Sequence, residues 1–240
     1  MLEPVRPGHP DRRIRWSGPV VSFDTKRKAE VVTDGVVMLD SLKRSLPPFV
    51  SAAVRNPKAV GAATPSSRAL AARMASAVPD TVAAPTVVEI GAGTGAFTRA
   101  ASERVSGGGR YIAVEQDERM AGHLERDNPN VEVVNGDAAE LGKILADRGV
   151  TSVDAVLCGL PWSLFTVAEQ RRILGEIATA MAPHAVFTTF AYVHAARIPG
   201  SKRFRAEVEA VFENVEAQPP VWRNLPPAMT YLCRGVRGEG

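Results

Sequence analysis

An acidic residue and three glycines at alternate positions, Glu89-x-Gly91-x-Gly93-x-Gly95, have the spacing in this 240-residue chain that points most directly to chemistry. The residues before the glycines, Thr86–Ile90, are mostly apolar and β-branched, as in a strand buried on both faces. The residues after Gly95 have helical character. A strand, a glycine turn and a helix bring backbone N–H groups against a nucleotide, because glycine has no Cβ to block the approach. The sequence therefore predicts a nucleotide-binding turn.

Two kinds of cofactor use such a turn. The spacing Gly91-x-Gly93-x-x-Ala96 matches a loose dinucleotide fingerprint, which is typical of nicotinamide-dependent oxidoreductases. The acid within the strand, Glu89, favours the second kind of cofactor, a nucleotide other than a dinucleotide, because a buried carboxylate is costly unless it meets a partner. A strand–turn–helix junction that binds no ligand is the third interpretation.

Two further acids follow predicted strands. Glu115 closes a strand at 110–114, 20 residues beyond Gly95, and can accept hydrogen bonds from both ribose hydroxyls of a cofactor without a 2′-phosphate. Asp137 follows a strand at 131–134 and can accept a hydrogen bond from the adenine amino group, or it can cap the next helix. We favour cofactor contact for Asp137, and we include Gln116 and Ala138, which follow the two acids, in the predicted site.

Repeated strand–helix units predict the fold. Beyond the first three strands, strands are expected at 152–158, 186–193, about 215–218 and 229–236, and helices at 96–105, 118–127, 167–181 and 201–212. Asp117 is the predicted N-cap of the second of these helices, and Thr166 with Glu169 forms a capping box for the third. These units predict a Rossmann-like α/β domain with a seven-stranded, mostly parallel sheet, one antiparallel strand and helices on both faces. Ligands of such sheets bind beyond the carboxyl ends of the strands.

The N-terminal region differs from the rest. Residues 1–33 are rich in Pro, Arg and Gly and are predicted to be a flexible tail, and the domain is placed at 34–240. Residues 34–46 form an amphipathic helix pattern, and a further helix is expected to begin with Thr64 as its N-cap. Between residues 41 and 79 there are six basic residues and no acidic one. The segment 34–78 is therefore expected to lie on an anionic membrane surface, or to cover the active site as a lid.

Composition narrows the class of protein. The chain is 45% hydrophobic with a formal net charge of +3, which does not by itself demand nucleic acid. Cys158 and Cys233 lie in apolar runs and are expected to be core thiols of a cytoplasmic protein. There is no apolar stretch of 18 residues and no secretory signal pattern. No metal site is predicted.

The Glu-x-Gly-x-Gly-x-Gly pattern resembles the first motif of class I methyltransferases, which bind S-adenosylmethionine. In that family the acid, here Glu89, helps to hold the methionine end of the cofactor. After the fourth predicted strand, Leu160-Pro161-Trp162 is similar to the Asn-Leu-Pro-aromatic motif of rRNA adenine dimethyltransferases. Gly159 replaces the asparagine that accepts from the target amine, so recognition of a flipped base is disfavoured.

A further resemblance covers roughly residues 50–234. Arg55–Gly61 with Pro65–Arg68, Gly159–Phe165 and Val221–Pro227 resemble bacterial phospholipid N-methyltransferases. Those enzymes are peripheral membrane proteins that methylate the ethanolamine headgroup of phosphatidylethanolamine. The resemblance implies S-adenosylmethionine as cofactor, Ser66 and Gly159 as further cofactor contacts, and a lipid substrate at the inner face of the cell membrane. An rRNA adenine dimethyltransferase and a small-molecule methyltransferase are the alternatives.

Transfer to an amine requires that a proton leaves first. His194, at the end of the fifth predicted strand, is the candidate base, and Tyr192 is its titratable neighbour; a polar strand end is the alternative for His194. Trp162 and Trp222 could offer π-faces to a cationic headgroup or could be packing aromatics. Arg197, Lys202 and Arg203 are expected either to meet lipid phosphate or to form a solvated face. His184 is interpreted as structural.

Overall fold

The computed structural model describes residues 66–105, 107–196 and 198–238. Seven strands form one sheet in the order β3-β2-β1-β4-β5-β7-β6. Neighbouring strands are parallel except that β7 runs antiparallel to both β5 and β6. The strands are β1 (Thr86–Ile90), β2 (Arg110–Glu115), β3 (Glu132–Asn135), β4 (Val153–Cys158), β5 (Met181–Tyr192), β6 (Phe212–Ala217) and β7 (Ala228–Val236). The predicted seven-stranded, mostly parallel sheet with one antiparallel strand is confirmed.

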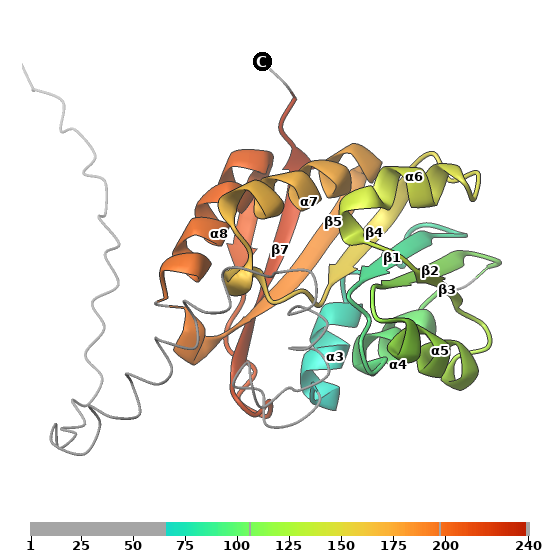
Figure 1. Ribbon diagram of the computed structural model, residues 1–240, viewed down its shortest axis with the longest axis horizontal. Coiled ribbons are helices and arrows are strands. Elements are labelled where there is room, and N and C mark those ends of the chain that lie inside the picture. The colour runs from blue at the N-terminus through green and yellow to red at the C-terminus, as the bar shows by residue number, and fades with distance from the viewer. Residues whose placement is uncertain (1–65, 106, 197, 239–240) are drawn as a thin grey trace, which may run out of the picture. The chain divides into compact units, whose positions relative to one another are not determined.

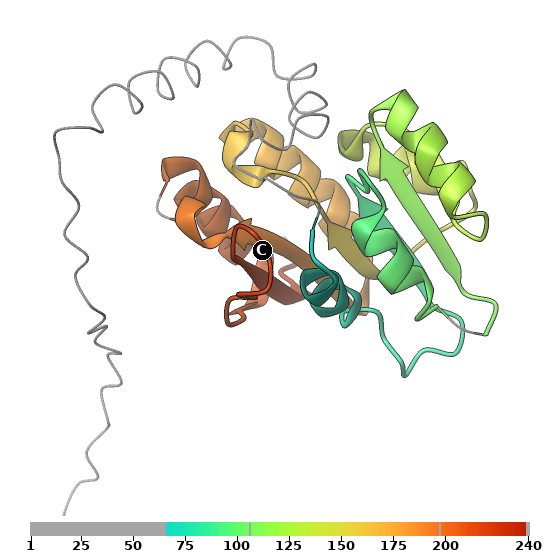
Figure 2. The same ribbon diagram turned by 90° about the horizontal axis from the view of Figure 1, so that it is seen from below.

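Helices cover both faces of the sheet (Figures 1 and 2). One face packs against α6 (Leu141–Ala146), α7 (Val167–Ala180) and α8 (Pro199–Val211), and the other against α3 (Arg68–Ala75), α4 (Ala96–Ser102) and α5 (Glu118–Asp127). Three short 3-10 helices lie in the connections: η2 (Ala138–Glu140), η3 (Trp162–Leu164) and η4 (Val193–Ala195). Apolar side chains alternate between the two faces along β1 and β2, as the period of two requires.

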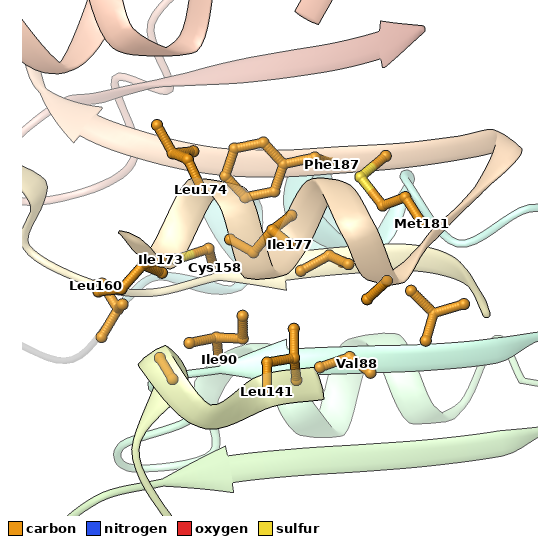
Figure 3. Close-up of a cluster of buried hydrophobic side chains, with 14 of the residues drawn as sticks. Val88, Ile90, Leu141, Cys158, Leu160, Ile173, Leu174, Ile177, Met181 and Phe187 are labelled. Carbon is orange, nitrogen blue, oxygen red and sulfur yellow. The ribbon is translucent and has the colours of Figure 1, made fainter. Parts of the chain in front are cut away.

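The alternation is clearest in β1. Val88 and Ile90 join the core under α6 and α7, which also contains Ile177 of α7 and Phe187 of the neighbouring part of the sheet, β5 (Figure 3). Val87 faces the opposite core, under α3 and α4. Glu89 shares the parity of Val87 and so carries its carboxylate into that second core. The sheet therefore places an acid directly beneath the glycine turn.

The predicted helix caps are mostly confirmed. Asp117 accepts hydrogen bonds from the N–H groups of Arg119 and Met120, and Thr166 with Glu169 forms the capping box of α7. The predicted start of the first helix at Thr64 is wrong: α3 begins at Arg68, and the hydroxyl of Ser67 accepts from the Leu70 N–H. A serine closer to the apolar stripe thus serves as the cap. Thr64 itself lies outside the described residues.

Two other local predictions have clear outcomes. β5 begins at Met181, five residues earlier than expected, so His184 lies within the strand, where its Nε2 is 2.7 Å from Asp154 Oδ1. That contact is at the end of the sheet opposite the carboxyl ends of the strands and fits the structural interpretation. Cys158 and Cys233 are buried free thiols, as predicted.

The predictions for the tail at 1–33, the amphipathic helix at 34–46 and the motif at 55–61 concern residues outside the described ranges. Within the described ranges, no helix is both long enough and apolar enough to cross a bilayer.

Candidate functional site

The glycine turn joins β1 to α4 in a backbone conformation that favours glycine. Gly91, Gly93 and Gly95 have φ values of 70°, 55° and 74°, a region that side chains with a Cβ rarely adopt. A Cβ on Gly91 would also lie 2.9 Å from Leu160 Cδ2. The turn is held in place by the Gly91 N–H, which donates to the Val114 carbonyl at 2.9 Å. The turn is thus closely packed and preorganised.

Glu115, at the carboxyl end of β2, lies against this turn. Its Oε2 accepts from the Gly93 N–H at 2.8 Å and its Oε1 accepts from the Asp117 N–H at 2.9 Å. Each carboxylate oxygen has a second lone pair, so Glu115 can still accept hydrogen bonds from two hydroxyl groups of a ligand. The structure brings together Gly93 and Glu115, as the sequence predicted.

Glu89 is fully buried below the turn. Its Oε2 accepts from Thr98 Oγ1 at 2.6 Å and from the Tyr111 hydroxyl at 2.8 Å. Among the described residues, Oε1 has no hydrogen-bond partner. Loss of water raises the pKa of Glu89 from 4.5 to about 7, although the two hydroxyl donors oppose the shift. Glu89 thus holds a proton part of the time near neutral pH and has one oxygen available to a further polar group.

Thr98 and Tyr111 are site residues that sequence reasoning missed. Tyr111 lies two residues before Ala113, which pairs with Glu89 across the β1–β2 ladder, so both side chains point to the same face. Thr98 lies on the first turn of α4, which crosses that face. The signal that could have found them was a hydroxyl at the matching parity of the neighbouring strand and another one helical turn after the glycines.

Asp137 adopts the capping role that the sequence left as its alternative. Its Oδ1 accepts from the Ala139 N–H at 2.9 Å and begins η2. Contact of its second oxygen with a cofactor stays a prediction. Beside it, Gln116 is exposed and Ala138 is buried. Asn135, which sequence reasoning also missed, donates through Nδ2 to the Glu115 and Gln116 carbonyls at 3.0 Å and ties the ends of β2 and β3 together.

Gly159 follows β4 and packs directly on the glycine turn. Its N–H donates to the Ile90 carbonyl at 2.8 Å. A Cβ at this position would lie 2.6 Å from the Gly91 carbonyl oxygen, which is closer than real Cβ contacts allow. The backbone of the glycine turn therefore contacts the backbone of Gly159, the position at which rRNA adenine dimethyltransferases carry an asparagine. In this backbone, position 159 offers peptide groups and no side chain.

Trp162 is a packing aromatic, which is one of the two roles that the sequence left open for it. The ring is buried, stacks on Phe204 with centroids 4.5 Å apart, and donates through Nε1 to Thr189 Oγ1 at 2.9 Å. The aromatic residue after Leu160-Pro161 thus anchors η3 onto α8 and β5. Sequence spacing alone could not distinguish an aromatic that faces a ligand from one that faces the core.

Tyr192 and His194 lie together at the carboxyl end of β5. Their rings are nearly parallel, with an interplanar angle of 15° and centroids 5.6 Å apart. Burial raises the pKa of Tyr192 above its usual value of 10, so the phenol stays neutral at physiological pH. His194 is exposed. Of this pair, the imidazole is the group suited to accept a proton from a substrate.

The loop at 218–227 crosses the same end of the sheet and contacts α3. Asn224 is buried, accepts from the Ser67 N–H through Oδ1 at 2.8 Å and donates through Nδ2 to the Pro226 carbonyl at 2.7 Å. This contact places the half-buried Ser66 at the same rim. Trp222 is 72% exposed, which excludes the packing role for it. Lys202 and Arg203 are exposed on α8, and Arg197 lies outside the described residues.

The described residues contain no cluster of three or more His, Cys, Asp or Glu side chains that could hold a metal ion. The site is thus an arrangement of a glycine turn, a buried acid, a strand-end acid and two rings, with the backbone of residue 159 between them.

Comparison with known proteins identifies methyltransferases as relatives of this chain. Residues 87–184 match a family described as "Methyltransferase domain". The chain is 36% identical over 154 residues to ornithine lipid N-methyltransferase from Singulisphaera acidiphila, an alignment that covers 63% of this chain and 76% of that protein. It is 33% identical over 108 residues to ribosomal RNA small subunit methyltransferase A from Chlorobium phaeobacteroides, covering 42% of this chain and 37% of that protein.

A solved structure shares the fold. A SAM-dependent O-methyltransferase from Thermotoga maritima superposes with a TM-score of 0.54 at 16% identity, over 71% of this chain and 66% of that chain.

Proposed function

Because this chain belongs to the class I S-adenosylmethionine-dependent methyltransferases, in one family with ornithine lipid N-methyltransferase, we propose that it methylates the amine of a membrane-lipid headgroup, specifically that of phosphatidylethanolamine. The observation that carries this proposal is the identity of 36% over 154 residues, which covers most of a lipid N-methyltransferase. The enzyme would act as a peripheral protein at the inner face of the cell membrane.

The residues around the glycine turn fit S-adenosylmethionine, the cofactor of this family. The turn presents backbone without Cβ atoms, Glu115 has lone pairs for two ribose hydroxyls, and Glu89 has an oxygen in need of a donor. We assign to the same site Gly91, Gly93, Gly95, Gln116, Asp137, Ala138, Gly159 and Ser66. When bound, the cofactor supplies a methyl group activated by a sulfonium.

The chain itself has to hold the amine and accept its proton. The Gly159 carbonyl is the group at the end of β4 that can accept from an amine, because that position has no side chain. The neutral Tyr192 hydroxyl can hold the amine in line with the methyl group, and His194 stacked on it can accept the proton. A primary amine is mostly protonated near neutral pH, so removal of this proton limits the fraction of reactive substrate.

Adenine of ribosomal RNA is the competing acceptor, supported by the alignment of 108 residues. Enzymes that act on a base read its hydrogen-bonding edge with positioned polar groups. At position 159 the place of an asparagine Cβ is taken by the Gly91 carbonyl. This geometry favours a substrate whose amine needs only one hydrogen-bonding oxygen from the protein, such as an alkyl amine, over a planar base.

The test is methyl transfer from labelled S-adenosylmethionine to three acceptors in parallel: phosphatidylethanolamine vesicles, ornithine-lipid vesicles and ribosomal RNA. Label in phosphatidylethanolamine is expected, and it should be lost in Glu115→Ala but retained in Glu125→Ala, which alters an exposed residue of α5. Label in ornithine lipid alone would contradict the choice of headgroup. Label in RNA alone would refute the lipid proposal.

A further inference from the structure

We propose that the loop at 218–227 docks the enzyme on a lipid bilayer through Trp222, Leu225 and Arg223, beside the site where the headgroup reacts. We call these three side chains the loop surface. The inference rests on the proposed function only for the identity of the reacting lipid, because the docking surface is defined by exposure and charge.

Exposed large apolar side chains gather at one end of the molecule. Four such residues are found in the described part of the chain: Trp222 at 72%, Leu225 at 65%, Ile198 at 41% and Val236 at 36% exposure. Trp222 and Leu225 lie in the loop that precedes β7, and Ile198 caps α8 just after the end of β5. All three are therefore at the carboxyl rim of the sheet, and only Val236 lies at the other end of β7.

The exposure of the loop surface is imposed by the residues between and beside it. Val221 is buried and its N–H donates to the Ala228 carbonyl at 2.7 Å. Asn224 is buried and bonded to Ser67 and Pro226. With residues 221 and 224 fixed inward, Trp222 and Leu225 are held outward. Exposed apolar side chains that gather in one patch with a polar rim mark an interaction site.

Trp222 and Leu225 match the chemistry of a bilayer interface. Tryptophan is enriched at the level of the lipid headgroups, where its ring is partly apolar and its N–H remains hydrated. Leucine gains by leaving water for the acyl region. This pair would therefore seat the loop at the boundary between headgroups and chains.

Charge around the loop points to the same partner. The segments 66–76, 193–205 and 218–228 contain no Asp or Glu. They do contain Arg223 in the loop surface, Arg68 and Arg73 on α3, and Lys202 and Arg203 on α8. Basic side chains near an anionic leaflet are attracted to it within a Debye length. An apolar tip inside a basic surrounding is complementary to an anionic membrane.

The loop lies next to the proposed acceptor site. Tyr192 pairs with Ala228 at the start of β7, and the Val193 N–H donates to the Pro227 carbonyl at 2.9 Å. The end of the loop is therefore bonded to the segment that carries Tyr192 and His194. A bilayer seated on the loop surface would present headgroups at that rim while the acyl chains stay in the membrane.

The first test uses the fluorescence of Trp222 in the full chain. The sequence has three tryptophans; Trp162 is buried under Phe204, and Trp16 is removed by Trp16→Phe. Vesicles of phosphatidylethanolamine and phosphatidylglycerol with brominated acyl chains are expected to quench the remaining exposed tryptophan. Trp222→Phe in the same background should abolish the quenching. Equal quenching with and without Trp222, or no quenching at all, would overturn the proposal.

The second test measures partitioning by vesicle sedimentation. Trp222→Ala with Leu225→Ala is expected to weaken binding about tenfold, which corresponds to about 1.4 kcal/mol. Val236→Ala, the matched control at the opposite end of β7, should leave binding unchanged. Both changed side chains are exposed, and circular dichroism verifies that the fold is intact. The proposal would be overturned if the double variant bound vesicles as well as the wild type. It would also be overturned if the wild type bound no vesicles but formed a dimer that the double substitution dissociates.

Activity separates this inference from the proposed function. If no lipid is methylated but Trp222 is quenched, the docking surface stands and the proposed substrate fails. If lipid is methylated and Trp222 is neither quenched nor needed for binding, the docking proposal fails alone. With both correct, the double variant should raise KM for vesicles about tenfold.

Discussion

Replacing Glu89 by glutamine removes a fully buried carboxyl whose pKa is raised to about 7. In the unfolded chain the same group titrates at its ordinary value of 4.5. Between these two values the folded protein binds more protons than the unfolded one. The free energy of unfolding therefore falls as the pH rises through this window. The stabilising effect of the neutral carboxyl is complete below pH 4.5 and is lost once the pH passes about 7.

The size of the effect follows from the shift. The difference between 4.5 and about 7, converted at about 1.4 kcal/mol per pH unit, gives about 3 kcal/mol of destabilisation when Glu89 is fully ionised. Glutamine has nearly the same shape and does not ionise, and its amide can meet the hydroxyls of Thr98 and Tyr111 that now contact Glu89. The free energy of unfolding of Glu89→Gln, taken relative to that of the wild type, should therefore rise by about 3 kcal/mol from below pH 4.5 to above pH 7.

Urea unfolding at a series of pH values from about 4 to about 8 measures this difference directly. Glu125→Gln, at an exposed position of α5, is the control and should follow the wild type throughout. If the unfolding free energies of Glu89→Gln and the wild type stay parallel over this range, Glu89 does not titrate between its unfolded value and neutrality. The account of the buried acid would then be refuted.

Three further changes test other parts of the site. Gly159→Ala puts a Cβ 2.6 Å from the Gly91 carbonyl and should destabilise the fold by about 1–3 kcal/mol, measured by urea unfolding. Asn224→Ala leaves the Ser67 N–H and the Pro226 carbonyl without partners, so a loss of about 1–3 kcal/mol is expected, whereas Arg223→Ala should cost far less. His194→Gln should lower kcat for the lipid amine about 100-fold, and a fully active variant would exclude His194 as base.

Features set by neighbouring residues could be predicted from the sequence. The glycine turn, the strand-end Glu115 and the Asp117 cap each depend on a few consecutive residues, and the structure places all of them as expected. Hydrophobic period and breakers likewise predicted the order of strands and helices, since the β-α connections allow few topologies. The error at Thr64 was a choice between three hydroxyl residues, Thr64, Ser66 and Ser67, each of which can cap a helix.

Features set by distant contacts could not be predicted. Asn224 accepts a hydrogen bond from Ser67 across 157 positions of the sequence, and the buried Trp162 stacks on Phe204, which belongs to the distant helix α8. The glycine at position 159 appeared in the sequence as the loss of an asparagine. The structure explains why glycine is required there, because the Gly91 carbonyl of the glycine turn occupies the space that a Cβ would need. Such contacts depend on how the elements pack, which local patterns do not specify.

The two halves of the site are built differently. The proposed cofactor half consists of the glycine turn, Glu89 and Glu115, which hydrogen bonds join to one another and to β2 and α4. The acceptor half joins β5 to the loop at 218–227 through the Val193–Pro227 bond and to α3 through Asn224. Asn224 also holds Ser67 beside Ser66, which we assign to the cofactor site, so we expect changes at Asn224 to affect both the choice of acceptor and the affinity for the cofactor.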